Sequence, residues 1–495
     1  MGDPRPAPEA GVPADVLDTE QAGPAAVRGG SLRVAGYAVG VLLTVASAAL
    51  VFRHLGVVDS GRYVTVLALT TLVAGITDIG LTTIGVRELA VRDEPGRRRL
   101  MRNLLGLRVV LSAVGVGVVV VFGVVAGYDE DMVAGTALAG LAVVGLAVQS
   151  TLGISLMVQL RLGWVTALEL LRQGVLVVGI VILVVAGAGV LPLLAVQVPA
   201  ALVALAATVL LVRGSVPVLP AFDRVEWGAL LRSILPFAAA TIIAAVYFRA
   251  ALIVLEIVST PRETGLFSAP FRITEVLLAV PNLVVGTAFP IFARAARDDH
   301  SRLAYGLGRV FQASVLLGML ALVGLALGAP FVIDVVAGPG FDPSVDVLRV
   351  QAIALAISFV ATPLAYAMLS LRMHGAILVL SATALAMNIT AVAILGSAEG
   401  AMGAAVGTVI AELAGLAVAW ILIRRRTPGV APGIGALVRV LPALGAALAV
   451  GLVPGLPALA AALIGAAVFA GVAYLSGAVP PELLAAFRPE RSTRS

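Results

Sequence analysis

Long apolar runs, separated by short polar or glycine-rich turns, make up the chain from residue 31 to residue 477. A helix of about 20 apolar residues is long enough to cross the hydrocarbon core of a bilayer. Runs of this length lie at residues 31–52, 63–86, 104–127, 132–159, 164–187, 190–212, 231–257, 265–293, 309–335, 347–371, 375–395, 400–423, 435–454 and 456–477. The pattern therefore predicts an all-α polytopic membrane protein with about 14 transmembrane helices.

The composition agrees with a membrane protein and argues against several kinds of site. Of the 495 residues, 60% are hydrophobic and only 12% are charged, which is about half the charged fraction of an average soluble domain. The chain has no cysteine and no lysine, and its three histidines lie far apart. We therefore expect no thiolate nucleophile, no P-loop nucleotide site, no metal site and no cofactor. The net charge of +5 does not predict nucleic-acid binding, because the position of each arginine matters more than the sum.

The arginines predict the orientation in the membrane. If the amino terminus is cytoplasmic, 27 of the 33 arginines lie in cytoplasmic segments, four in external segments and two within spans. Retention of positive residues on the cytoplasmic side produces such an alternation. We therefore expect a multi-pass protein of the plasma membrane, surrounded by its lipids, with both termini in the cytoplasm. The exclusive use of arginine, with abundant alanine, glycine and valine, suggests a bacterial source.

An internal repeat of about 204 to 211 residues divides the spans into two sets of six. Gly61 and Gly265 each open a span before an aromatic residue, and Arg213 and Arg424 each end one. The alternative is that positive-inside retention alone places arginine at the inner end of such helices. The repeat predicts two six-helix lobes in parallel orientation around a central cavity, with two extra C-terminal helices. The expected division is a disordered cytoplasmic tail at 1–29, an N-terminal lobe at 30–213, a linker at 214–230, a C-terminal lobe at 231–426, an extra helix pair at 427–477 and a second tail at 478–495.

Two arginines within predicted spans are the main candidates for substrate binding. Arg249 and Arg272 belong to neighbouring spans and are expected at similar depth in the outer half of the membrane. A guanidinium group binds phosphate oxygens with two parallel hydrogen bonds, so the pair suits a diphosphate. The alternative is internal neutralisation, because Glu275 and Glu256 follow the two arginines at helical spacing. Both interpretations hold together if a substrate phosphate displaces a carboxylate.

Carboxylates and amides within spans form a second set of candidates. Asp78 and Glu412 have no basic residue nearby in the sequence, so they are either ion-coupling sites or neutral hydrogen-bonded acids. Glu256 is a third candidate for ion coupling. H⁺ or Na⁺ is the expected coupling ion. Four amides, at Gln149, Gln197, Asn282 and Asn388, are interpreted as helix–helix hydrogen bonds or as cavity lining. Of these, Asn282 is included with Arg249, Arg272 and Glu275 among the substrate-binding candidates.

Three short motifs resemble those of polysaccharide and O-antigen-type lipid-linked oligosaccharide flippases. They are Thr77-Asp-Ile-Gly-Leu81 with Arg87-Glu88, Gly265-Leu-Phe-Ser-Ala-Pro-Phe-Arg272 with Pro281-Asn282, and Gly403-Ala-Ala-Val-Gly407 with Glu412. The resemblance covers about residues 31 to 426 and implies the fold of the multidrug/oligosaccharidyl-lipid/polysaccharide transporter superfamily. The chain departs from the lipid II flippase branch in its first span, which has no charge between Arg33 and Arg53.

The sequence thus favours a flippase that translocates polyprenyl-diphosphate-linked oligosaccharide from the inner to the outer leaflet by alternating access. An ion-coupled multidrug or metabolite antiporter of the same superfamily is the alternative, but only 5% of the residues are aromatic and the candidate site contains arginines, which favours an anionic substrate. A membrane glycosyltransferase or polymerase is disfavoured, because no long extramembrane loop is predicted. We therefore expect no enzymatic activity.

Overall fold

The computed structural model describes residues 22–480, and every regular element in this range is a helix. Residues 1–21 and 481–495, which contain most of the two predicted tails, lie outside the described range. Helix α1 (Ala22–Asp78) begins within the first predicted tail. The all-helical prediction is therefore confirmed for the described part of the chain.

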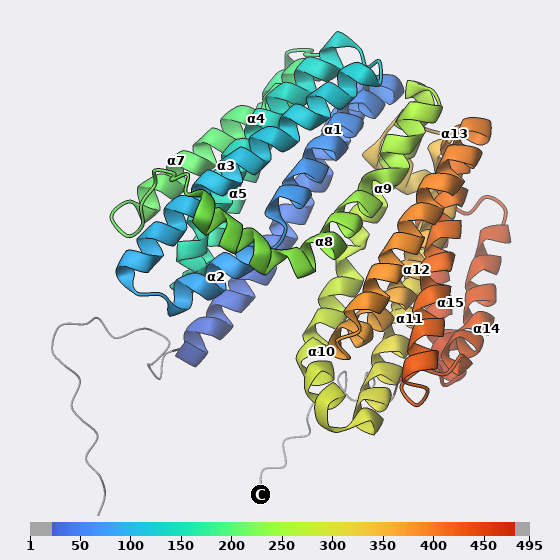
Figure 1. Ribbon diagram of the computed structural model, residues 1–495. Coiled ribbons are helices and arrows are strands. Elements are labelled where there is room, and N and C mark those ends of the chain that lie inside the picture. Colours follow the sequence, from blue (N-terminus) through green and yellow to red (C-terminus); the bar gives the residue numbers. More distant parts are fainter. Residues whose placement is uncertain (1–21, 481–495) are drawn as a thin grey trace, which may run out of the picture.

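Figure 1 shows the helices in two groups that lie next to each other, which we call the N-terminal and C-terminal lobes. The N-terminal lobe contains α1, α2 (Leu81–Val91), α3 (Glu94–Val125), α4 (Glu130–Val158), α5 (Leu162–Val185), α6 (Val190–Ala195) and α7 (Gln197–Val212). The C-terminal lobe contains α8 (Arg224–Val258), α9 (Pro261–Leu277), α10 (Ala279–Asp298), α11 (His300–Val336), α12 (Ser344–Ser370) and α13 (His374–Arg426). Helices α14 (Gly435–Ala449) and α15 (Ala458–Leu475), joined through a 3₁₀ turn at Val450–Leu452, pack against α11.

Two long helices each contain two of the predicted spans. Eleven helical segments of the described residues are long and apolar enough to cross a membrane, and two of these, Val39–Val91 and His374–Arg426, have 53 residues each. At about 1.5 Å per residue, such a segment is more than twice as long as the hydrocarbon core is thick. Gly56 and Gly400 bend the two helices with φ of 69° and 58°, a region that glycine adopts without a Cβ clash. The count of 14 spans remains a prediction.

A third predicted span, at residues 265–293, is interrupted near its middle. Helix α9 ends at Leu277 and α10 begins at Ala279. Pro281 has no N–H to donate to the Leu277 carbonyl, so the helix loses a hydrogen bond at this break. The interruption separates the outer part of the span, with Arg272, from the inner part.

The two lobes meet at the end that the arginine pattern assigns to the outside. Gly61 of α1 and Gly265 of α9 are in such close contact that a Cβ on Gly265 would lie 1.9 Å from the Val57 carbonyl oxygen. Arg53 reaches from α1 to the end of α11, where it donates to the carbonyls of Asp334 and Val335 at 2.6 and 3.1 Å. Glycine at both contact positions thus allows α1 and α9 to close the outer end backbone against backbone.

The linker between the lobes is held against the inner end of α3. The Trp227 indole N–H donates to the Asn103 carbonyl at 3.0 Å, and Arg99 pairs with Asp223 at 2.8 Å. The hydrogen bond from Arg99, together with the backbone N–H groups of Val225 and Glu226, holds the pKa of Asp223 below its usual range. The first turn of α8 is therefore fixed to the N-terminal lobe, although the rest of this helix belongs to the C-terminal lobe.

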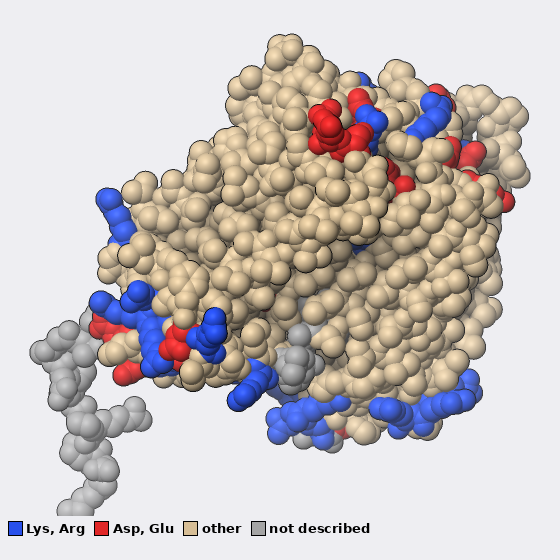
Figure 2. Space-filling view, turned by 45° about the horizontal axis from the view of Figure 1, so that its top comes forward, with Lys and Arg blue, Asp and Glu red and all other residues tan. Residues whose placement is uncertain are grey.

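The charged side chains visible in Figure 2 lie at two opposite ends of the molecule, with a broad uncharged band between them. Most arginines in this view follow the lower edge, whereas the acidic residues at the upper edge are accompanied by few arginines. An uncharged band of this kind matches the hydrocarbon core, and the arginine-rich edge matches a cytoplasmic surface. The orientation itself remains a prediction.

We expect single cysteines at positions 130, 188 and 398 of this cysteine-free chain to react with an impermeant thiol reagent added to whole cells. These positions lie at the start of α4, after α5 and next to the bend in α13, at the end predicted to be external. Mass tagging of each variant before and after cell lysis measures the exposure. Protection of all three positions in intact cells would contradict the predicted topology.

Candidate functional site

A cavity of about 730 Å³ lies mainly within the N-terminal lobe. Its lining residues come from helices of this lobe, with the exception of Arg272, which reaches it from α9 of the C-terminal lobe. Three arginines (Arg108, Arg172 and Arg272) and two carboxylates (Asp78 and Glu169) line the cavity. Charged groups at membrane depth are costly unless they are paired or in contact with water, so the partners of each one indicate its role.

Arg108, in the middle of α3, forms an ion pair with Asp78 at the end of α1. The side chain of Arg108 is only 5% exposed, whereas that of Asp78 is 40% exposed and faces the cavity. Arg108 also donates to Thr82 at 2.6 Å and to Ser150 at 3.1 Å. Our interpretation of Asp78 as a carboxylate without a basic partner was therefore wrong, because its partner is 30 residues away in the sequence and on another helix.

The second ion pair lies on α5. Arg172 donates through Nε to Glu169 at 3.1 Å, and the side-chain amide of Gln173 donates to the same carboxylate at 2.9 Å. The spacing of three residues on one helix made this pair predictable from the sequence. The two cavity-lining carboxylates of the N-terminal lobe are thus both matched by an arginine.

The third cluster joins two helices of the C-terminal lobe around a single carboxylate. Glu275 on α9 accepts from Arg272 at 2.7 Å and from Arg249 on α8. Arg249 is buried and lies over the ring of Phe271, 5.6 Å from its centroid. The internal neutralisation that we considered for these residues therefore exists. It is incomplete, because two guanidinium groups share one carboxylate, and Arg272 is the member of the triad that faces the cavity.

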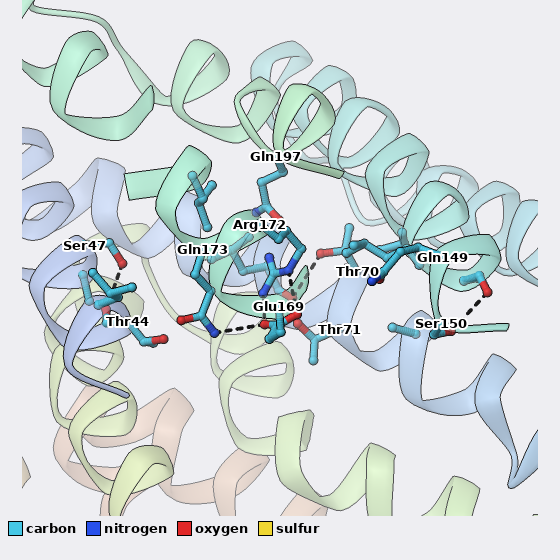
Figure 3. A pocket seen from close by; sticks show the side chains of 18 of the residues that line it. Thr44, Ser47, Thr70, Thr71, Gln149, Ser150, Glu169, Arg172, Gln173 and Gln197 are labelled. Carbon is cyan, nitrogen blue, oxygen red and sulfur yellow. Dashed lines mark hydrogen bonds and ion pairs between the residues drawn. The ribbon is translucent and has the colours of Figure 1, made fainter. Parts of the chain in front are cut away.

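Amide and hydroxyl groups form the rest of the polar lining (Figure 3). They are contributed by α1, α2, α4, α5 and α7, and ten of the lining residues are labelled in the figure: Thr44, Ser47, Thr70, Thr71, Gln149, Ser150, Glu169, Arg172, Gln173 and Gln197. Within the described part of the chain, the amides of Gln149 and Gln197 have no hydrogen-bond partner in the protein. The expected helix–helix hydrogen bonds of these two residues are therefore absent, and the alternative interpretation, cavity lining, is correct.

A second cavity, of about 270 Å³, lies within the C-terminal lobe. Glu412 on α13 lines it and accepts a hydrogen bond from the hydroxyl of Tyr247 on α8. Asn282 and Asn388 line the same cavity. The side chain of Asn282 donates to the Leu278 carbonyl of its own helix at 2.9 Å. The side-chain oxygen of Asn388 has no hydrogen-bond partner among the described residues. The helix–helix hydrogen bonds expected of these two asparagines are thus absent as well. The structure separates Asn282 from Arg272, with which it was grouped as a substrate-binding candidate.

Glu256, the third ion-coupling candidate, lies where the lobes meet at the outer end. It is close to Arg62 and to Thr65 of the N-terminal lobe and to Thr264 of α9. One of its carboxylate oxygens is buried without a hydrogen-bond partner among the described residues. Arg249, which we considered as its partner, is instead bound to Glu275. The position of Glu256 assigns it to the contact between the lobes rather than to either cavity.

Arg108 and Gln173 are site residues that sequence reasoning missed. Arg108 was counted among the cytoplasmic arginines, although the predicted span begins at residue 104. A signal was present, because a carboxylate such as Asp78 within a span requires a partner and Arg108 was available in the next predicted helix. Among the described residues, no group of three or more histidine, aspartate or glutamate side chains could hold a metal ion.

Comparisons with known proteins agree with this architecture. A family model described as "Polysaccharide biosynthesis protein" matches residues 27–296, which is more than half of the chain. No curated protein sequence matches the chain.

Several solved structures share the fold. The lipid II flippase MurJ in an inward closed conformation is 11% identical, with a TM-score of 0.76 over 92% of this chain and 99% of that chain. An inward-facing multidrug resistance transporter of the MATE family in the MOP superfamily is 14% identical, with a TM-score of 0.60 over 78% of this chain and 94% of that chain. A further transporter of this superfamily, from Pyrococcus furiosus, is 15% identical, with a TM-score of 0.53 over 82% of this chain and 96% of that chain. The predicted superfamily fold is thereby confirmed.

Proposed function

Because the chain belongs to the polysaccharide biosynthesis protein family, we propose that it is a flippase for polyprenyl-diphosphate-linked oligosaccharide, which it moves from the inner to the outer leaflet. The family and the fold are those of membrane transporters and flippases, not of catalytic enzymes. The reaction is binding followed by a change of access, and no covalent bond forms or breaks.

The observation that carries this proposal is the surplus positive charge at Arg272. Arg108 and Arg172 each have a carboxylate partner, whereas Arg249 and Arg272 share Glu275. The triad of Arg249, Arg272 and Glu275 therefore keeps a net charge of +1, and its cavity-facing member is the Arg272 guanidinium group. A diphosphate at this position neutralises the surplus and accepts bidentate hydrogen bonds.

The contact between the lobes supports alternating access. The outer end is closed by Gly61, Gly265 and Arg53, while Asp78 and Arg108 line the cavity about 25 Å from Gly61, as estimated from the rise per residue of α1. A substrate in the inner leaflet reaches the cavity from the side of these two residues. Separation of α1 from α9 then exposes the cavity to the outside.

An antiporter for multidrug or metabolite substrates remains the second candidate, since MATE transporters share the fold. Aromatic residues are scarce in the larger cavity, where Phe52 and Tyr63 are the aromatic members of a lining that mixes polar and aliphatic side chains. Drug-like cations with large apolar groups are usually bound by aromatic faces and carboxylates. The arginine-rich cavity favours an anionic lipid over a cationic drug.

We expect Arg272→Gln to weaken binding of polyprenyl diphosphate about ten- to hundredfold, because a hydrogen bond to a charged group contributes about 1.5–3 kcal/mol. Arg272→Lys keeps the charge but loses the bidentate geometry, so its affinity should lie between those of Arg272→Gln and the wild type. Equilibrium binding and transport in vesicles, with melting temperatures measured in parallel, check this prediction.

The matched control is Arg349→Gln. Arg349 forms an ion pair of the same spacing with Asp346, outside both cavities, so its loss should leave binding unchanged. If Arg272 only shares Glu275 with Arg249, Arg272→Gln should leave binding of polyprenyl diphosphate unchanged, because Glu275 still pairs with Arg249. Unchanged binding in a folded Arg272→Gln variant would show that Arg272 is structural and that the phosphate assignment is wrong.

For the coupling ion, we propose that Glu412 in the smaller cavity takes up H⁺ or Na⁺. It is a carboxylate at membrane depth whose described hydrogen-bond donors, the hydroxyls of Tyr247 and Ser358, are neutral. Glu412→Gln should therefore abolish the dependence of transport on an imposed H⁺ or Na⁺ gradient. Asn388→Leu, in the same cavity, serves to distinguish loss of the ion from loss of packing. Unchanged gradient dependence in Glu412→Gln would exclude Glu412 as the coupling residue.

A further inference from the structure

We propose that Gln149, Gln173 and Gln197, which we call the amide wall, form a subsite for the sugar of the substrate and select an uncharged sugar. This inference rests on the proposed function and adds a substrate class to it. The three glutamines come from α4, α5 and the start of α7, and Figure 3 shows them on different sides of the Arg172–Glu169 pair.

Most of the hydrogen-bonding capacity of the amide wall is not used within the protein. Gln149 and Gln197 are half-buried, and among the described residues they have no protein partner. The amide of Gln173 donates to Glu169 at 2.9 Å, while its side-chain oxygen has no partner in the described part of the chain. Amides at membrane depth are costly unless they are hydrogen-bonded, so their presence around a cavity indicates a polar ligand.

The neighbouring hydroxyl groups complement these amides. Thr44, Ser47 and Thr70 donate their hydrogens to carbonyls of their own helix, at 2.9, 2.9 and 3.0 Å. Their oxygens keep free lone pairs and can still accept a hydrogen bond, and all three residues line the cavity, whereas Gln149 and Gln197 offer both donors and acceptors. Each sugar hydroxyl both donates and accepts a hydrogen bond, so this mixture suits a sugar better than a purely anionic group.

The charges around the amide wall exclude a strong preference for an acidic sugar. Arg108 and Arg172 are each paired with a carboxylate, so this part of the cavity has no surplus cation. The carboxylate of a uronic acid would have to compete with Asp78 or Glu169 for an arginine. The surplus charge lies at Arg272, where we place the diphosphate, and one cavity of about 730 Å³ contains both regions. This volume is within the roughly 300–1,000 Å³ typical of small-molecule sites.

The test uses the full chain in lipid nanodiscs and three lipids: undecaprenyl diphosphate, the same lipid bearing a neutral disaccharide, and the same lipid bearing a disaccharide with one uronic acid. Binding is measured for the wild type, Gln149→Leu, Gln197→Leu and the double variant. Gln159→Leu is the matched control, because this residue is exposed at the end of α4 and lies outside the cavity. Thermal unfolding shows whether each variant folds.

We expect the neutral disaccharide to strengthen wild-type binding relative to the bare lipid, and the uronic acid to reduce that gain. Each leucine variant in the amide wall should lower the affinity for the lipid with the neutral disaccharide about three- to tenfold, the usual contribution of one hydrogen bond. The affinity for the bare lipid should stay unchanged. Equal loss for all three lipids, or an unchanged gain in the double variant, would overturn the subsite. Equal wild-type affinity for the bare lipid and for the lipid with the neutral disaccharide would also overturn the subsite. Failure of all three lipids to bind would overturn the proposed function itself.

Discussion

Gly265→Leu should abolish transport while the protein still inserts and folds. A Cβ at this position would lie 1.9 Å from the Val57 carbonyl oxygen and 2.7 Å from its carbon, and backbone atoms cannot move aside as a side chain can. The substitution therefore forces α1 and α9 apart at the outer end. Overpacking of this kind costs about 1–3 kcal/mol, which shifts a conformational equilibrium about five- to 150-fold.

Labelling of a cysteine at Leu67, which lines the larger cavity, reports this shift. An impermeant thiol reagent added from outside should label Leu67→Cys faster when Gly265→Leu is also present. Gly117→Leu is the matched control, because a Cβ on Gly117 meets no atom within 4 Å. If Gly265→Leu transports normally and does not change the labelling rate, α1 and α9 do not close the outer end during transport.

Asp78→Ala should lower the free energy of unfolding by about 3 kcal/mol. Its partner Arg108 is nearly fully buried and would keep only neutral acceptors, Thr82 and Ser150. Loss of one member of a buried ion pair costs about 3–5 kcal/mol, and we expect the low end because Asp78 is 40% exposed. Asp78→Asn retains an oxygen acceptor for Arg108 and should therefore lose less.

The double variant Asp78→Ala with Arg108→Leu should recover most of the stability, since it removes the unpaired buried charge. Glu169→Ala is the comparison at a more exposed pair, where ion pairs usually contribute about 0–1 kcal/mol. Denaturant titration of the purified variants measures all four. Unchanged stability of Asp78→Ala would mean that Arg108 does not depend on this carboxylate, and the ion-coupling hypothesis for Asp78 would regain its support.

Much of the fold followed from the sequence, because apolar run length and arginine placement are local properties. The repeat also singled out Gly61 and Gly265, but the sequence showed only that they occupy equivalent places, not that they touch. The Arg272–Glu275 and Arg172–Glu169 pairs were accessible because each lies within one helical turn.

Contacts between helices could not be derived in the same way. Arg249 and Glu275 are 26 residues apart, and Asp78 and Arg108 are 30 apart, so no helical spacing relates them. Asn282 lies ten residues beyond Arg272 in the same predicted span, and the sequence did not show that the two residues line different cavities. The amides of Gln149 and Gln197 were expected to form helix–helix hydrogen bonds, and only the placement of the helices showed that they line a cavity.

The most direct test of the account is lipid translocation by the purified wild-type chain in proteoliposomes. Undecaprenyl-diphosphate-linked disaccharide is placed in one leaflet, and an impermeant glycosyltransferase added outside modifies only sugars in the outer leaflet. We expect the protected fraction to become accessible at a rate that rises with the number of chains per vesicle and falls in Arg272→Gln. Translocation at the rate of protein-free vesicles would contradict the proposal that this protein is a flippase for such lipids.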